Sequence, residues 1–154
     1  MSIYASQSAY LPRESTDRLF MNPATKTVLS GRIADTLNFI SDFQLISPEM
    51  WKRFVRQFSD HTDSNDEGWR GEYWGKMMRG ATFVYEVTRD PALFSVLKDT
   101  VENMMSAADE NGRISSYTLE AELTGWDLWC RKYVILGMQY FTEICEDEEF
   151  NSKV

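Results

Sequence analysis

Gly-Glu-Tyr-Trp at positions 71–74 opens an apolar, helix-forming run that ends at the turn of positions 88–91. About 55 to 57 positions later the pattern returns: Trp-Asp-Leu-Trp at 126–129 opens a second apolar run, which ends at the acidic residues 146–149. In both copies an acidic residue stands two positions before a tryptophan, and a hydrophobic residue follows the closing acidic turn. A repeat of this length, with one helix out and one helix back, is typical of a stacked array of α-hairpins.

The second copy stops where its returning helix should begin. A single hairpin of this kind cannot bury both of its faces, because the neighbouring repeats normally cover them. We therefore expect the chain to be the first part of a longer array, or to pair with another chain or a second copy of itself.

Apolar residues recur at a spacing of three to four over most of the remaining chain, and no segment alternates with period two for long enough to predict a sheet. Ser47 before Pro48 and the Asp90-Pro91 pair are helix-start signals, because a polar cap followed by proline suits the first helical turn. The fold class predicted is all-α. The expected helices cover residues 28–45, 47–58, 69–88, 91–108 and 125–145. Residues 1–27 lack periodicity and are expected to form a surface arm, which leaves 28–154 as the helical domain.

Composition excludes several classes of protein. The chain has 154 residues, and 16 Lys and Arg against 24 Asp and Glu give a formal net charge of −8, which argues against binding nucleic acid through phosphates. Hydrophobic residues make up 43% and aromatic residues 14%, too many for a disordered chain. No apolar run has the roughly 20 residues that a membrane helix requires. Two cysteines and no visible signal peptide favour a reduced, cytoplasmic setting.

The residue types that carry most catalytic chemistry are sparse. The single histidine, His61, lies in a polar loop and is expected to be solvated. No cluster of His and Cys has metal-ligand spacing, so no metal site is predicted, and no phosphate-binding glycine loop is present. Cys130 has a neighbouring cation in Arg131, which favours a thiolate, but a helical cysteine flanked by aromatic residues is more often part of the core. We assign no catalytic residue in this chain.

The two helix openings are the candidate binding site. Aromatic faces stack on the C–H surfaces of sugars, and carboxylates accept hydrogen bonds from hydroxyl groups. Lys76 belongs to the first opening, and Trp129 and Arg131 belong to the second. The alternative is an acidic residue that favours a helix N-terminus beside a buried tryptophan. The residues expected to bind carbohydrate are Glu72, Trp74, Trp126 and Asp127.

The segment 69–76, followed by Thr-Arg-Asp-Pro at 88–91, resembles the opening of an early barrel helix in the β-L-arabinofuranosidase-like glycoside hydrolases. The turn at 111–114 is similar to that family's Asp-Gly-Tyr-Leu turn, and 126–133 is similar to its next helix. The resemblance covers about Trp69 to Phe150, a little over half of the chain.

This resemblance implies a toroid of six α-hairpins, of which 28–154 would be an incomplete first part. It also implies that the family's catalytic glutamate and zinc-bound cysteine belong to segments that have no counterpart here. No cofactor is therefore expected in this chain, although zinc is implied for a complete family domain. Tyr133 stands where some members place a sugar-binding histidine.

Two functions are expected from these observations. In the first, the chain is the N-terminal part of a glycoside-hydrolase-like domain for polysaccharide side chains, which supplies scaffold and one edge of a carbohydrate cleft and is inactive alone. In the second, the chain is a complete helical module that binds a protein partner or associates with itself.

Overall fold

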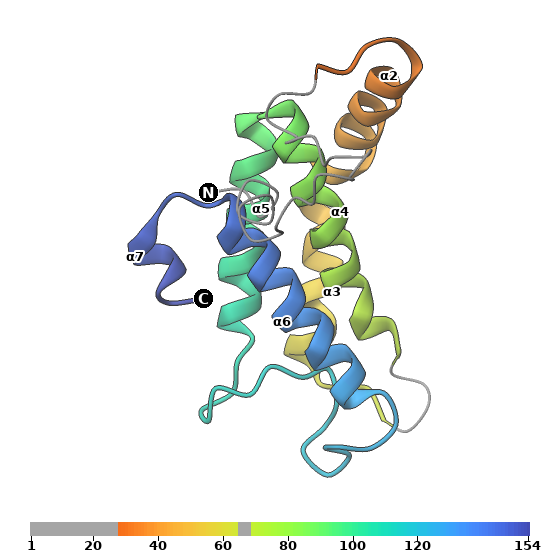
Figure 1. Ribbon diagram of the computed structural model, residues 1–154. Helices are drawn as coiled ribbons and strands as arrows, with labels where there is room; N and C mark the ends of the chain where they lie inside the picture. The colour runs from red at the N-terminus through yellow and green to blue at the C-terminus, as the bar shows by residue number, and fades with distance from the viewer. Residues whose placement is uncertain (1–27, 65–68) are drawn as a thin grey trace, which may run out of the picture.

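The protein is described by a computed structural model that covers residues 28–64 and 69–154 (Figure 1). The predicted arm at 1–27 lies outside the described residues. The all-α prediction is confirmed: the described part consists of helices, without a strand, and one isolated bridge joins Asp63 to Tyr117. No described helix is both long enough and apolar enough to cross a membrane. The elements are α2 (Gly31–Ile40), the π-helical turn η2 (Ser41–Leu45), α3 (Pro48–Asp60), the short η4 (Trp69–Gly71), α4 (Glu72–Thr88), α5 (Pro91–Ser106), α6 (Asp127–Ile144) and α7 (Glu148–Asn151).

The helices pack in two layers. In Figure 1, α4 and α6 lie side by side in front, with α3 and α5 behind them. α4 and α6 are parallel, because Glu72 meets Trp129 near their first turns and Phe83 meets Tyr140 further along both helices. The helices that open the two copies of the sequence repeat are therefore neighbours in one layer.

Two glycines allow α4 and α6 to approach closely. A Cβ atom added at Gly75 would lie 1.9 Å from the carbonyl oxygen of Tyr133, and one added at Gly137 would lie 2.7 Å from Cζ3 of Trp74. The distance between packed helices depends on the side chains at the contact. Here it depends on the absence of side chains at two positions.

In the other layer a groove lies between α3 and α5, lined among others by Trp51 and Val96.

The helix boundaries follow the signals of the sequence. Asp90 caps α5, since its carboxylate accepts a hydrogen bond of 2.9 Å from the backbone N–H of Ala92. Ser47 precedes α3 as predicted, although its side chain makes no capping hydrogen bond. The acidic residues 146–149 include the start of a short helix. Asp147 accepts a hydrogen bond from the N–H of Phe150 and begins α7, at the place where the second copy should return.

The core lies between the two layers and draws mainly on α3, α4, α5 and α6. Its indole groups are hydrogen-bonded as well as packed: Nε1 of Trp51 donates to the carbonyl oxygen of Leu45 at 2.8 Å. The fully buried aromatic and large aliphatic side chains are Trp51, Phe58, Trp74, Met78, Leu93, Leu97, Met104, Tyr117 and Phe141.

Candidate functional site

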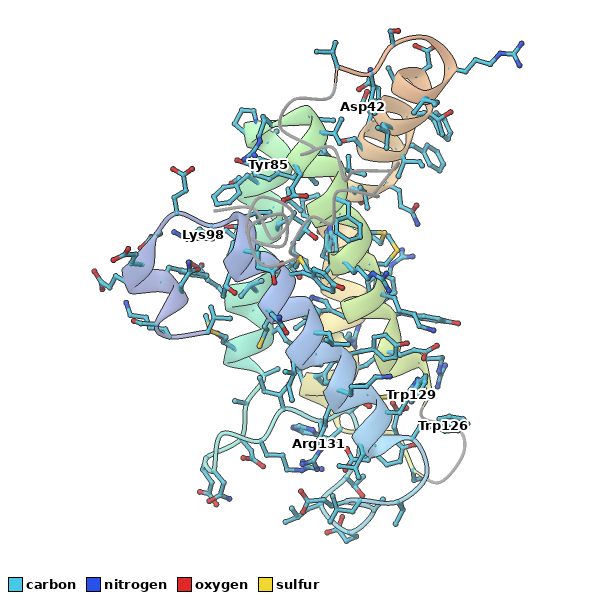
Figure 2. The ribbon with its side chains drawn as sticks, viewed as in Figure 1. Asp42, Tyr85, Lys98, Trp126, Trp129 and Arg131 are labelled. Atoms are coloured by element: carbon cyan, nitrogen blue, oxygen red, sulfur yellow. The ribbon has the colours of Figure 1, made fainter. Side chains whose placement is uncertain are left out.

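The candidate site lies where α4 and α6 begin. Glu72 is the first residue of α4, and Trp126 and Trp129 stand on either side of the first residue of α6. Figure 2 shows Trp126, Trp129 and Arg131 at this end of the molecule. We call Glu72, Lys76, Trp126, Trp129 and Lys132 the opening cluster.

Glu72 is held as a carboxylate. Its Oε1 accepts a hydrogen bond of 2.7 Å from Nζ of Lys76, and its Oε2 accepts one from Nε1 of Trp129. Burial by itself would raise the pKa of Glu72. The hydrogen bonds from Lys76 and Trp129, with the positive charge of Lys132, nevertheless hold that pKa below its ordinary value. Glu72 is therefore an acceptor already fixed in position, and it lacks the raised pKa of a general acid.

Trp126 and Trp129 present the exposed aromatic surface of the cluster. Each side chain is 40% exposed, and their ring centroids lie 6.1 Å apart in an edge-to-face arrangement. Trp126 is positioned from the loop, because its backbone N–H donates to the hydroxyl oxygen of the buried Tyr117 at 2.9 Å. The sequence placed Trp129 at the second opening, but it was not among the four residues expected to bind carbohydrate. Its place in the acidic-x-tryptophan repeat was the signal that could have identified it.

Trp74 and Asp127 do not line a surface, which corrects the expectation that they face a cleft. Both side chains are fully buried. Trp74 packs against α6 and donates from Nε1 to Oγ1 of Thr100 at 3.0 Å. The sequence shows that a tryptophan recurs at helix openings, but only the packing shows that the first copy points inward and the second copy outward.

Asp127 joins the 107–126 loop to α6. Its carboxylate accepts hydrogen bonds from the hydroxyl of Ser115, from the N–H of Leu123 at 2.8 Å and from Nε of Arg131 at 2.9 Å. Burial alone would raise the pKa of Asp127, but these donors and the Arg131 charge hold that pKa below its usual value. Glu122 extends the network, because it accepts from Arg131 at 2.6 Å. The role of Asp127 in this structure is to fix the loop that carries Trp126.

Two further side chains near this end differ in how well the sequence predicted them. Cys130 is a core residue, as expected: it is fully buried, and burial, followed by the negative charges of Asp63 and Glu72, raises the pKa of its thiol to about 11. His61 is not simply solvated. It ends α3 in a left-handed conformation, and its Nδ1 lies 2.7 Å from the carbonyl oxygen of Ser115.

Within 28–64 and 69–154, no three acidic, His or Cys side chains are grouped so as to hold a metal ion.

Comparisons with protein-family models, with curated proteins and with solved structures gave no match. The geometry of the opening cluster and of the helices that carry it is therefore the basis for a functional proposal.

Proposed function

We propose that this chain is the opening portion of a glycoside-hydrolase-like α/α toroid, and that it supplies scaffold and one edge of a carbohydrate cleft. The observation that carries the proposal is the parallel pairing of α4 and α6, the two repeat-opening helices, with Glu72, Trp126 and Trp129 gathered at their common end. In a toroid of hairpins the opening helices form the inner layer and the returning helices form the outer layer. α4 and α6 would then be inner helices, and α3 and α5 would be outer helices.

The returning helices support the same repeat. Asp90 and Asp147 are 57 positions apart, and each caps the helix that follows an opening helix. α7 has only four residues, but it begins as α5 begins, with a buried hydrophobic residue three positions after the capping aspartate: Leu93 in α5 and Phe150 in α7.

One face of α6 supports continuation of the array. At the same 57-residue offset, Met78 of α4 corresponds to Ile135 of α6. Met78 lies one turn beyond Trp74, on the side of α4 that meets α6, and is fully buried. Ile135 is 66% exposed. A further opening helix packed on α6 would bury Ile135, but at a larger distance than that between α4 and α6, because Lys132 stands where α4 has Gly75.

The chemistry of the cluster favours binding over hydrolysis. Sugar rings stack on aromatic faces, and Trp126 and Trp129, each 40% exposed, lie beside a fixed carboxylate. Glycoside hydrolysis normally needs two carboxyl groups, one of them a general acid with a raised pKa. Glu72 has a lowered pKa, and Asp127 is buried against Arg131. The cleft residues we propose are Glu72, Trp126 and Trp129. The first two were expected from the sequence, and Trp129 replaces the buried Trp74 and Asp127.

Calorimetric titration of the chain with an arabinofuranose-containing oligosaccharide tests this function. We expect weak saturable binding, which Trp126→Ala and Trp129→Ala abolish, because stacking area is lost at the cluster. Phe43→Ala is the matched control, since it removes an exposed aromatic ring from η2 instead. Aryl arabinofuranosides should not be hydrolysed. Binding that survives both tryptophan variants would refute the proposed site, and turnover by the chain alone would refute its non-catalytic role.

A second candidate function rests on the same open face of α6. Leu128 and Ile135 lie two turns apart and are 61% and 66% exposed, so this face can also dock a protein partner or a second copy. Sedimentation velocity separates the possibilities. A single defined dimer, abolished by Ile135→Glu, would favour the interaction module over the opening of a toroid.

A further inference from the structure

Cations and aromatic rings alternate along the seam between α4 and α6. Nζ of Lys132 lies 3.4 Å from the centroid of the Trp129 ring and 4.0 Å from that of Tyr133. Nζ of Lys76, across the seam, lies 5.1 Å from the same Tyr133 ring. The cation–aromatic strip consists of Lys76, Arg79, Trp129, Lys132, Tyr133 and Tyr140.

The strip continues along the seam beyond the opening cluster. The guanidinium carbon of Arg79 lies 5.9 Å from the centroid of Tyr140. Trp129 and Tyr140 are eleven positions apart on α6, so the strip extends for about 16 Å at the helical rise of about 1.5 Å per residue. Such a length accommodates more than one sugar unit.

The charge of the strip is opposite to the charge of the chain. The whole chain carries a net charge of −8, yet the strip holds three cations, and the carboxylate beside it is Glu72. Glu72 is engaged by Lys76 at 2.7 Å. Among the residues that the structure describes, neither Lys132 nor Arg79 has a carboxylate within 4.0 Å, and both side chains are exposed. Two cations are thus held over aromatic rings with their outer sides available to a ligand.

We propose that the strip binds the carboxylate groups of an acidic glycan, with Lys132 and Arg79 as the carboxylate-binding residues. This inference rests on the proposed carbohydrate cleft and names the chemical class of its ligand. Charge complementarity favours an anion, because neither Lys132 nor Arg79 makes a close ion pair with a described carboxylate. The exposed Trp126 and Trp129 at one end of the strip favour a glycan over an acidic peptide, since sugar C–H faces stack on such rings.

Calorimetric titration with trigalacturonate and with its fully methyl-esterified form tests the inference, because the two differ in charge at equal length. We expect the acid to bind about tenfold more tightly than the ester. The carboxylates of the acid accept charge-assisted hydrogen bonds from the two cations, whereas the uncharged ester groups accept only weaker ones. Lys132→Gln and Arg79→Gln should each remove most of that preference. Arg56→Gln is the control, since Arg56 is an exposed cation on α3 that pairs with Asp60. Raising the salt concentration should weaken binding of the acid and leave binding of the ester unchanged.

Four other outcomes are decisive. Equal affinity for acid and ester would overturn the carboxylate preference and leave a carbohydrate cleft in place. Binding of an arabinofuranose-containing oligosaccharide without binding of trigalacturonate would also overturn the carboxylate preference and leave the carbohydrate cleft in place. Poly-glutamate of equal charge that binds as tightly as trigalacturonate would overturn the glycan assignment in favour of an acidic protein. Absence of saturable binding for every sugar up to about 10 mM would overturn both the inference and the proposed function.

Discussion

Substituting alanine for Gly75 should separate α4 from α6. The added Cβ would lie 1.9 Å from the carbonyl oxygen of Tyr133, whereas real Cβ contacts are essentially never under 3.0 Å, so one helix must move by about 1 Å. The opposing atom belongs to backbone and cannot rotate away. Overpacking costs typically ~1–3 kcal/mol, and a backbone clash lies at the upper end. Part of this cost is offset, because alanine is more favourable than glycine inside a helix by about 1 kcal/mol. We therefore expect a net destabilisation of about 2 kcal/mol.

Gly80 is the matched control in the same helix. A Cβ atom added at Gly80 meets nothing within 4 Å, so Gly80→Ala should stabilise the protein by up to about 1 kcal/mol. The two variants should then differ by about 3 kcal/mol in the free energy of unfolding. At about 2–4 °C per kcal/mol for a chain of this size, their Tm values should differ by about 6–12 °C. Urea denaturation followed by circular dichroism measures the difference. Equal stability of the two variants would refute the close approach of α4 and α6.

Three further predictions concern groups around the opening cluster. Trp74→Phe should destabilise the protein by about 1–3 kcal/mol in urea, because the buried hydroxyl of Thr100 loses its donor; an unchanged midpoint would contradict this hydrogen bond. Asp127 has a folded-state pKa below its unfolded value, so its stabilising contribution is complete above the unfolded pKa near about 3.9 and is lost as the pH falls through the folded pKa. Asp127→Asn should therefore flatten the acid limb of the stability–pH curve, and an acid limb as steep as in the unmodified protein would count against the network. The thiol of Cys130, with a pKa of about 11 and no exposure, should not react with a thiol reagent at pH 8 until urea is added; rapid labelling of the native protein at this position would show that α6 opens.

The sequence predicted helix boundaries well where local chemistry determines them. Asp90 followed by proline started a helix as expected, because a cap and a fixed φ act within one turn. The start of α7 at Asp147 was missed, since a run of acidic residues also suits a solvated tail. The distinction required knowing that Phe150 finds a buried site, and that depends on the packing of distant helices.

The sequence brought the two helix openings together, but it did not predict which of their residues are exposed. The repeat indicated that the two openings belong together, and Glu72 of α4 does lie beside the Trp126–Trp129 pair at the start of α6. Burial of Trp74 and Asp127 could not be predicted from the same motif. Each depends on a partner far along the chain or in an irregular loop, Thr100 for the indole and Ser115 for the carboxylate. Periodicity specifies which residues share a helix face, but it does not specify which residues of that face a loop will cover.

The glycine contact has a consequence for shape. α4 and α6 touch through backbone at Gly75 and Gly137, whereas a groove lies between α3 and α5. A pair of hairpins that is narrow on one side and broad on the other is a wedge. Wedges stacked in the same orientation bend toward the narrow side, so α4 and α6 would lie on the concave wall of an extended array. The two glycines would thereby set the curvature of the array. The cation–aromatic strip along the same seam would face the concave side of that array.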